Sequence, residues 1–265
     1  QIGASVDAHN IAIGYNAGLN VTTATQNTII GGLAGDALTT GSNNVVLGYQ
    51  ALSTEDTGGR NVAIGYQALK AANYDGHAYN LAIGFGAGSD VTTGQQNVLL
   101  GGLAGYSLTE GHSNVAIGMQ ALESEDAHGR NIAIGQEALQ TLNAGANAYN
   151  VAMGYQAGHL MTTGVRNTII GGLSGDAITT GGDNVSLGYN SLTSNTIGNS
   201  NVAIGKDSML TNVAADRNVA VGLGTLQAMT FSTTADTYNT AVGYAAGQAV
   251  TSGSLNTLIG GQAGD

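Results

Sequence analysis

Apolar residues recur in groups of three along the whole chain, and each group lies between an Asn and a Gly. This frame occurs fifteen times, and its copies start at Asn10, Asn27, Asn44, Asn61, Asn80, Asn97, Asn114, Asn131, Asn150, Asn167, Asn184, Asn201, Asn218, Asn239 and Asn256. Successive copies lie 17 residues apart in eleven cases, 19 in two and 21 in one. A fixed short period with one apolar segment per period indicates a solenoid, whose neighbouring repeats supply each other's core. We predict that residues 1–265 form a single repeat array, an all-β solenoid of about fifteen coils.

The apolar segment of each repeat is predicted to be a strand that is buried on both faces. With the Asn as position zero, positions one, two and three are Val62, Ala63 and Ile64 in one typical copy. Alternate side chains of a strand point to opposite faces, so positions one and three share one face and position two lies on the other. A single-chain solenoid has only one interior. We therefore predict that the second face, represented by Ala63 and Ala116, lies against a neighbouring subunit.

The framing Asn and Gly are predicted to have structural roles. The Gly at position four is invariant, which suggests a positive φ or the close approach of another backbone. Asn tolerates left-handed geometry and bonds to nearby backbone, and stacked Asn amides form ladders. We interpret Asn61, Val62, Ala63, Ile64 and Gly65 as the structural repeat.

Position eight divides the coils into two designs. It is Leu or Met in seven coils, as in Leu52, and Gly in the others, as in Gly35. Complete Gly-type coils carry an aliphatic residue at position eleven instead, as in Leu38. We predict that a second strand of either design fills the same core slot. Pairs of the two designs alternate and give a four-coil super-repeat, in which Asn10, Asn80 and Asn150 correspond.

Composition narrows the function classes further. Cys is absent, so disulfides and thiolate metal sites are excluded. A net charge of −11 would repel a phosphate backbone, and we expect no nucleic-acid partner. No apolar run reaches the length of a membrane span, so we expect no membrane insertion. Both ends fall inside repeats, with Ile2-Gly3 resembling the tail of a preceding strand, and we expect a fragment of a longer fibrous protein.

The repeat resembles that of a known family. Asn61-Val62-Ala63-Ile64-Gly65 and Asn201-Val202-Ala203-Ile204-Gly205 resemble the head repeats of YadA-type trimeric autotransporter adhesins, and are similar to repeats of bacteriophage tail-fibre proteins. The resemblance implies a left-handed parallel β-roll, a homotrimer around a common axis, and attachment to surfaces from an extracellular, cell-surface or virion location. The repeat is longer here than in the adhesin heads. No catalytic residue carries over.

Charged residues cluster in equivalent loops. Acidic groups follow the Leu-type coils and an Arg precedes the next Asn, which gives Glu55, Asp56 and Arg60 in one loop and Glu123, Glu125, Asp126 and Arg130 in the other. All four Arg of the chain, including Arg166 and Arg217, occupy this position before an Asn. These loops favour a rim salt bridge. A cation site or a receptor contact is the alternative.

No arrangement of residues indicates catalysis. The five His (His9, His77, His112, His128 and His159) have no repeat position common to all, although His77 and His128 both lie three residues before an Asn. Convergent metal ligands are therefore not expected unless a trimer axis joins three copies. The Gly-rich stretches open no helix, which excludes a nucleotide-binding loop. We predict no enzyme activity, no cofactor and no metal.

The expected function is structural and adhesive. We expect a segment of a trimeric extracellular fibre, either a phage tail fibre or a bacterial surface adhesin, that contacts a surface glycan or protein receptor. A self-assembling extracellular filament is one alternative. An ice-binding solenoid is another, because Thr pairs such as Thr22-Thr23 recur, although the rank is interrupted every two coils. Tyr follows the Gly in several coils, as in Tyr49 and Tyr66, and we expect it to pack between subunits rather than to stack on glycans.

Overall fold

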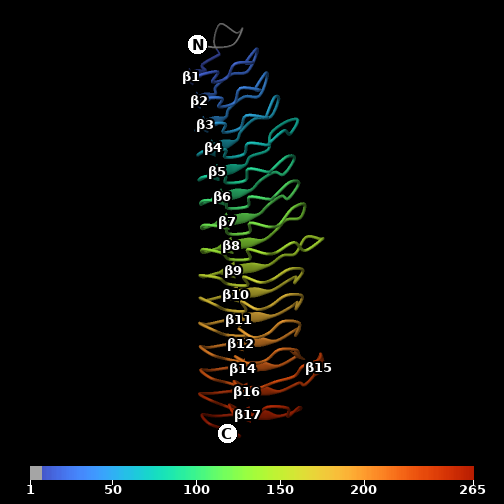
Figure 1. Ribbon diagram of the computed structural model, residues 1–265. Helices are drawn as coiled ribbons and strands as arrows, with labels where there is room; N and C mark the ends of the chain where they lie inside the picture. The colour runs from blue at the N-terminus through green and yellow to red at the C-terminus, as the bar shows by residue number, and fades with distance from the viewer. Residues whose placement is uncertain (1–7) are drawn as a thin grey trace. The chain divides into compact units, whose positions relative to one another are not determined.

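The computed structural model describes residues 8–265, and contacts divide the chain into two units, Gln1–Arg130 and Asn131–Asp265. Each unit is a parallel β-solenoid in which every coil contributes one short strand to a common sheet (Figure 1). The described residues form about 15 turns and contain no helix. The predicted all-β solenoid is therefore confirmed. The strand predicted before Ile2-Gly3 lies outside the described residues.

The strands are three residues long and occupy positions one to three of the repeat. In the N-terminal unit they are β1 (Ile11–Ile13), β2 (Thr28–Ile30), β3 (Val45–Leu47), β4 (Val62–Ile64), β5 (Leu81–Ile83), β6 (Val98–Leu100) and β7 (Val115–Ile117). In the C-terminal unit they are β8 (Ile132–Ile134), β9 (Val151–Met153), β10 (Thr168–Ile170), β11 (Val185–Leu187), β12 (Val202–Ile204), β14 (Val219–Val221), β16 (Thr240–Val242) and β17 (Thr257–Ile259). Two shorter strands, β13 (Ala215–Asp216) and β15 (Ala235–Asp236), pair with each other.

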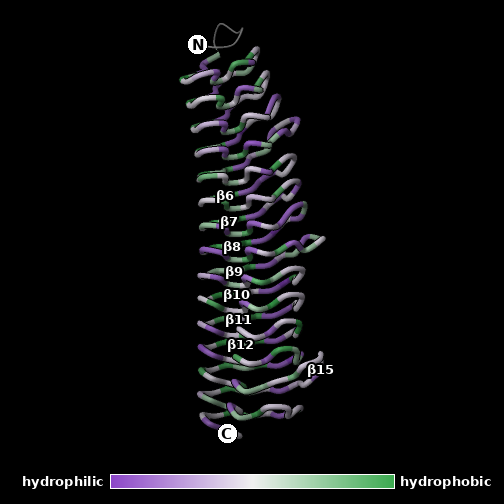
Figure 2. The backbone as a smooth tube through the Cα atoms, viewed as in Figure 1, coloured by the Kyte–Doolittle hydropathy of each residue, from purple (hydrophilic) through white to green (hydrophobic). Residues whose placement is uncertain are grey.

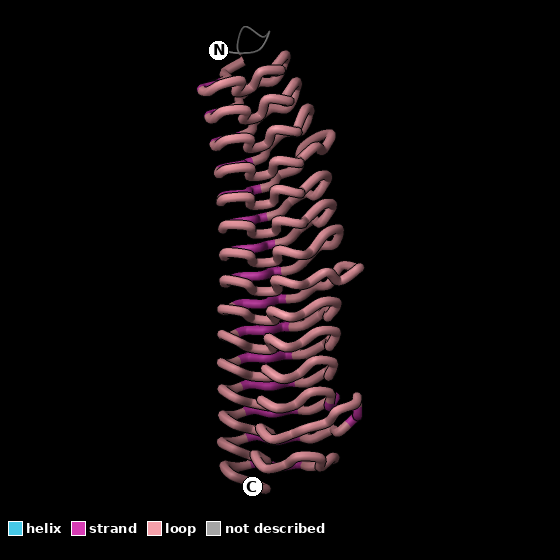
Figure 3. Tube along the Cα trace, viewed as in Figure 1, coloured by secondary structure: helices cyan, strands magenta, loops and turns pink. Residues whose placement is uncertain are grey.

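Register is kept across the longer repeats. Val62 pairs with Leu81, and Val219 pairs with Thr240, although both of these coils are longer than the common repeat. The extra residues are placed in the loops, outside the row of strands in each unit (Figure 3). The apolar period therefore sets the stacking, and the loops absorb the differences in length.

The inner and outer faces of the sheet are the reverse of the sequence-based prediction. Position two points into the coil, and Ala63 and Ala116 are 0% exposed within a single chain. Positions one and three point outward, and Leu47 and Ile83 remain 43% and 40% exposed. The prediction that the Ala row meets a neighbouring subunit is wrong. Alternation along a strand separates two faces but does not say which is inside. The hydropathy of the chain recurs from coil to coil (Figure 2), and position two is the buried one whether it is Ala63 or Ile29.

Turns, rather than a second strand, fill the rest of the core. Leu52 at position eight and Leu38 at position eleven are both fully buried, as predicted, but they lie in turns. Position eight is left-handed in both designs, with φ of 49° at Leu52 and 48° at Gly35. A Cβ on Gly35 would lie 2.9 Å from Cδ1 of Leu38. In this coil the side chain at position eleven therefore takes space that a side chain at position eight would need. The coils of Leu139 and Leu226 differ, because they bury a large side chain at both positions, together with Leu142 and Met229.

The invariant Gly at position four meets both predicted conditions. Gly171 has a φ of 133°, and a Cβ there would lie 2.5 Å from the carbonyl oxygen of Gly188 in the next coil. Such a separation is too short for any side chain. The coils therefore stack at a backbone distance that only Gly allows.

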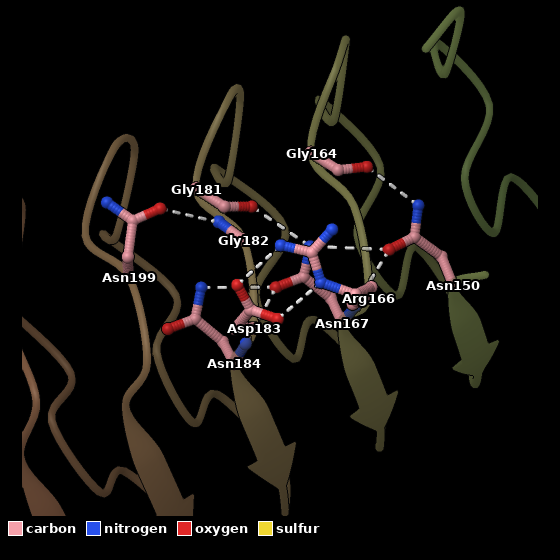
Figure 4. A network of polar contacts seen from close by, with 9 residues as sticks. All are labelled: Asn150, Gly164, Arg166, Asn167, Gly181, Gly182, Asp183, Asn184 and Asn199. Atoms are coloured by element: carbon pink, nitrogen blue, oxygen red, sulfur yellow. Dashed lines mark hydrogen bonds and ion pairs between the residues drawn. The ribbon is translucent and has the colours of Figure 1, made fainter. Parts of the chain in front are cut away.

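The framing Asn residues form a ladder inside the loops (Figure 4). The Oδ1 of Asn150 accepts the backbone N–H of Asn167 at 2.9 Å, and the Nδ2 of Asn167 donates to the carbonyl of Gly181 at 2.9 Å. The first bond joins neighbouring coils and the second closes one coil. The Asn itself does not use the left-handed geometry that it tolerates; the residue before it does, as at Arg166 with a φ of 57°.

Candidate functional surfaces

The outward face of the strands exposes apolar side chains in both units. Its members are the exposed aliphatic residues at positions one and three and the residues at position five, and we call it the outer apolar row. In the N-terminal unit it includes Ile11, Ile13, Tyr15, Val45, Leu47, Tyr49, Tyr66, Ile83, Phe85 and Met119. In the C-terminal unit it includes Ile132, Met153, Tyr155, Leu187, Tyr189, Leu223, Val242, Tyr244 and Ile259.

Aromatic rings stack along this row. The ring centroids of Tyr49 and Tyr66 are 5.7 Å apart, and those of Tyr66 and Phe85 are 5.1 Å apart, with nearly parallel planes. The stacking follows from the repeat, because position five of each coil lies above position five of the one before. The rings stack on one another, so they present mainly their edges outward. This geometry suits packing against another surface more than stacking on a sugar ring.

The acidic loops are only partly on the surface. Glu55 and Glu125 are fully buried, which contradicts their predicted role as outer-loop contacts. The Oε1 of Glu55 accepts the backbone N–H of Gly58 at 2.7 Å, and Oε2 accepts that of Tyr74 at 3.3 Å. Burial raises the pKa of Glu55 above its usual 4.5, and the two backbone donors oppose that shift. Glu55 therefore holds the loop together from inside.

In another coil an Asn occupies the repeat position of Glu55. Asn195, also at position eleven, is buried and accepts the backbone N–H of Gly198 at 2.8 Å. Glu55 and Asn195 thus share a local role, which requires an oxygen acceptor at this position rather than a charge. The sequence signal was the polar residue at a position that is otherwise aliphatic in many coils.

The second acidic loop brings three potential ligand groups together. Atoms of Glu125, Asp126 and His128 lie within 4.8 Å of one another, and the Nδ1 of His128 is 3.6 Å from the Oε1 of Glu125. Carboxylate and imidazole groups are ligands for divalent cations. An ion pair between a protonated His128 and the carboxylates accounts for the same geometry without a cation. The sequence-based prediction of no metal stays a prediction.

The Arg residues form two kinds of pair with the next coil. Arg166 binds Asp183 through two parallel bonds, Nε to Oδ1 at 2.6 Å and Nη2 to Oδ2 at 2.8 Å (Figure 4). This pair lowers the pKa of Asp183 through the hydrogen bonds and the charge of Arg166. It is a rim salt bridge within one chain, but not between the acidic loops and the Arg residues for which the sequence predicted one. Both side chains are about half exposed, so its contribution to stability is small.

Arg60 and Arg217 pair with tyrosines that sequence reasoning did not single out. The guanidinium of Arg60 lies over the ring of Tyr79 at 5.3 Å, and that of Arg217 lies over Tyr238 at 5.7 Å. Each Nη1 also donates to the phenol oxygen of its tyrosine. A signal was present in all three enlarged repeats: the Asn that ends each one follows a Tyr (Tyr79, Tyr149 and Tyr238), and the Asn that begins it follows an Arg (Arg60, Arg130 and Arg217).

The remaining predicted contact residues stay at the surface. Arg60 and Arg130 are exposed, and Asp56, Glu123 and Asp126 are half-buried. Arg60 is bonded to Tyr79 and has no ion pair with Glu55 or Asp56. The acidic group and the Arg of the first loop are therefore separate features, because the backbone turns between them and Glu55 enters the core.

The Thr ranks are used within the solenoid. The hydroxyl of Thr22 donates to the carbonyl of Thr39 at 3.0 Å, and that of Thr162 donates to the carbonyl of Thr179 at 3.2 Å. These bonds extend the ladder between coils. The hydroxyls at this position therefore already have a protein acceptor.

Comparison of the chain with protein-family models, curated proteins and solved structures gives no match. The part of the chain that the structure describes has no helix with the length and hydrophobicity to cross a membrane. It also encloses no pocket. The features available for function are therefore the outer apolar row and the side chains on the outer loops.

Proposed function

We propose that the chain is a structural and adhesive segment of a trimeric extracellular fibre. The observation that carries this proposal is the outer apolar row. Soluble monomers rarely expose contiguous apolar patches beyond a few hundred Å², and here many coils of both units add exposed aliphatic or aromatic side chains to the same face, as Val45, Leu47 and Tyr49 do.

A second copy of the chain is the partner that fits this row. Its spacing repeats with the coil, so an identical chain offers the same period in register. The side chains at positions three and five of one chain, such as Leu47 and Tyr49, would then pack between those of the other chain and be buried. Three copies of a left-handed parallel roll around one axis follow from the resemblance of the repeats to adhesin heads and tail fibres.

The mechanism is mechanical. The Asn ladder and the strand pairs hold successive coils, while the outer row holds the chains together. Loops such as the one ending at Tyr79 then face away from the axis and contact a host or another surface. A phage tail fibre and a bacterial surface adhesin both use such an arrangement.

Sedimentation equilibrium of the native protein tests the proposal. We expect a particle of three times the chain mass. A single-chain mass at micromolar concentration would overturn the assembly and with it the fibre.

A further inference from the structure

The two Arg–Tyr pairs differ in what surrounds them. Asp216 pairs with Asp236 across β13 and β15, and Gly59 forms the equivalent backbone bridge with His77. His77 and Asp236 both lie three residues before the Asn that follows, so they are matched residues of the two coils. The N-terminal unit thus has Gly and His where the C-terminal unit has two carboxylates.

The C-terminal pair is complete within the chain. The Oδ2 of Asp236 pairs with the Nη1 of Arg217 and accepts the phenol O–H of Tyr238 at 3.2 Å. A guanidinium, a phenol and a carboxylate therefore satisfy one another. This site shows which group fits beside an Arg on a Tyr ring in this fold.

The N-terminal pair lacks that carboxylate. Arg60 has no ion pair among residues 8–265, and the imidazole of His77 contacts the edge of the Tyr79 ring, with centroids 6.1 Å apart. A Cβ on Gly59 would lie 2.4 Å from the carbonyl oxygen of Ser42 and 3.1 Å from the Nδ1 of His77, so the backbone of the preceding coil and the imidazole both lie close to this glycine. Arg60, His77 and Tyr79 are all exposed. They form a cationic and aromatic surface on a chain with a net charge of −11.

We propose that Arg60, His77 and Tyr79 bind the carboxylate of an acidic saccharide. The ligand carboxylate takes the place that Asp236 fills in the other unit, where the guanidinium and the phenol bind it through charge-assisted hydrogen bonds. The neighbouring Asp75 is exposed and already accepts the hydroxyl of Thr57 at 2.8 Å. Its carboxylate can accept further hydroxyl groups, and a uronic acid carries hydroxyls beside its carboxylate, so we commit to a uronic-acid chain as the ligand.

The open surface sets the expected strength. Residues 8–265 form no pocket around this site, so a single site binds its carboxylate weakly. A polysaccharide with a carboxylate on each sugar residue binds more tightly, because it contacts the sites of several chains at once. This inference gives the proposed attachment a chemical target and in that respect rests on the proposed function.

Binding of oligogalacturonate to the native protein, followed by calorimetry at 0.15 M salt, tests the site. Arg60→Gln and His77→Asp should each weaken binding by about tenfold or more, the second because it supplies the internal carboxylate seen at Asp236. The matched control, Arg166→Gln, should leave the affinity unchanged. Circular dichroism and sedimentation should show that all three variants stay folded and assembled.

A variant that is designed to gain a binding site makes the test stricter. The double variant Asp216→Gly and Asp236→His should add a second uronate site per chain. The carboxyl-reduced, neutral form of the same saccharide should not bind. Unchanged affinity in Arg60→Gln, equal binding of the neutral chain, or equal binding of poly-glutamate would overturn the inference. A trimer that binds no uronate would also overturn it while leaving the structural role intact, whereas a single-chain particle would overturn the proposed function whatever it binds.

Discussion

The backbone N–H of Asn184 donates to the Oδ1 of Asn167 at 3.0 Å, and the same bond recurs between consecutive framing Asn residues in both units. The Nδ2 of Asn167 simultaneously closes its own coil on Gly181. One buried side-chain amide therefore provides hydrogen-bond partners for a backbone N–H and a backbone carbonyl that would otherwise be buried without a partner. Only Asn supplies both groups at this reach.

Replacing a ladder Asn should destabilise the fold in proportion to the number of buried polar groups that lose their hydrogen-bond partner. Asn167→Ala removes the partners of the Asn184 N–H and the Gly181 carbonyl, at about 1–3 kcal/mol for each buried group. Asn61 has no partner for its Nδ2 among the described residues, because its coil is longer than the common repeat and the closing carbonyl is displaced. Asn61→Ala should therefore cost roughly half as much in denaturant unfolding. Equal losses would show that coil closure contributes nothing.

Adjacent glycines should respond oppositely to the same change. Gly171→Ala places a methyl group 2.5 Å from the Gly188 carbonyl at a φ of 133°, and we expect a loss of more than about 2 kcal/mol. At Gly172 the nearest atom is a ring carbon of Tyr189 at 3.7 Å and φ is not in the positive range. Gly172→Ala should shift the free energy of unfolding by less than about 1 kcal/mol. Similar destabilisation of both variants by thermal unfolding would contradict the close-stacking explanation.

Ser186, the one polar residue at position two, forms hydrogen bonds with two other buried serines. The Oγ of Ser186 lies 2.7 Å from that of Ser174 and also bonds to Ser191, and all three are fully buried. Ser186→Ala alone should cost about 1–2 kcal/mol, because it disrupts the bonds of the remaining hydroxyls. The triple Ser→Ala variant should cost less than the sum of the single changes, since most other coils carry Ala at these positions. Additive losses in unfolding would rule out a coupled cluster.

The buried Glu55 should make stability depend on pH. Because burial raises its pKa in the folded state, the folded protein holds the proton more tightly than the unfolded chain. Its contribution to stability is therefore greatest at acid pH and falls as pH rises from about 4.5 through the folded-state pKa.

Glu55→Gln removes that charge and keeps an oxygen for the Gly58 N–H, as Asn195 does at Gly198. The variant should be more stable than the wild type at pH 7, and the difference should vanish at pH 4. Urea unfolding at both pH values measures it. A wild type that is more stable at pH 7 would mean that the backbone donors outweigh the burial of the carboxylate.

The period made most of the fold predictable. The spacing of the Asn–Gly frames located the strands, and the invariant Gly indicated the close stacking seen at Gly171. The aliphatic residues at positions eight and eleven correctly marked core side chains, as Leu52 and Leu38 show, although the coil of Leu139 and Leu142 uses both positions at once. These features repeat in every coil, so each copy supports the others.

Features that depend on three-dimensional direction were not predictable. Ala63 and Ile64 are both apolar, so alternation could not decide which of them faces the interior. Glu55 looked like a surface residue because charge usually means exposure, but its loop turns the carboxylate toward the backbone of Gly58. The contact of Arg60 with Tyr79 joins residues of neighbouring coils, so its sequence signal becomes apparent only when the repeats are aligned on their framing Asn.

The central claim is that a second copy of the chain covers the outer apolar row, and the most direct test compares particle mass with and without that row. Leu47→Lys and Ile83→Lys together place two charges on the outward face, and Glu110→Lys adds a charge at an exposed loop as the control. We expect the wild type and the control to sediment at three times the chain mass, and the double variant to sediment as a folded single chain. A wild type of single-chain mass, or a double variant that remains assembled, would contradict the account.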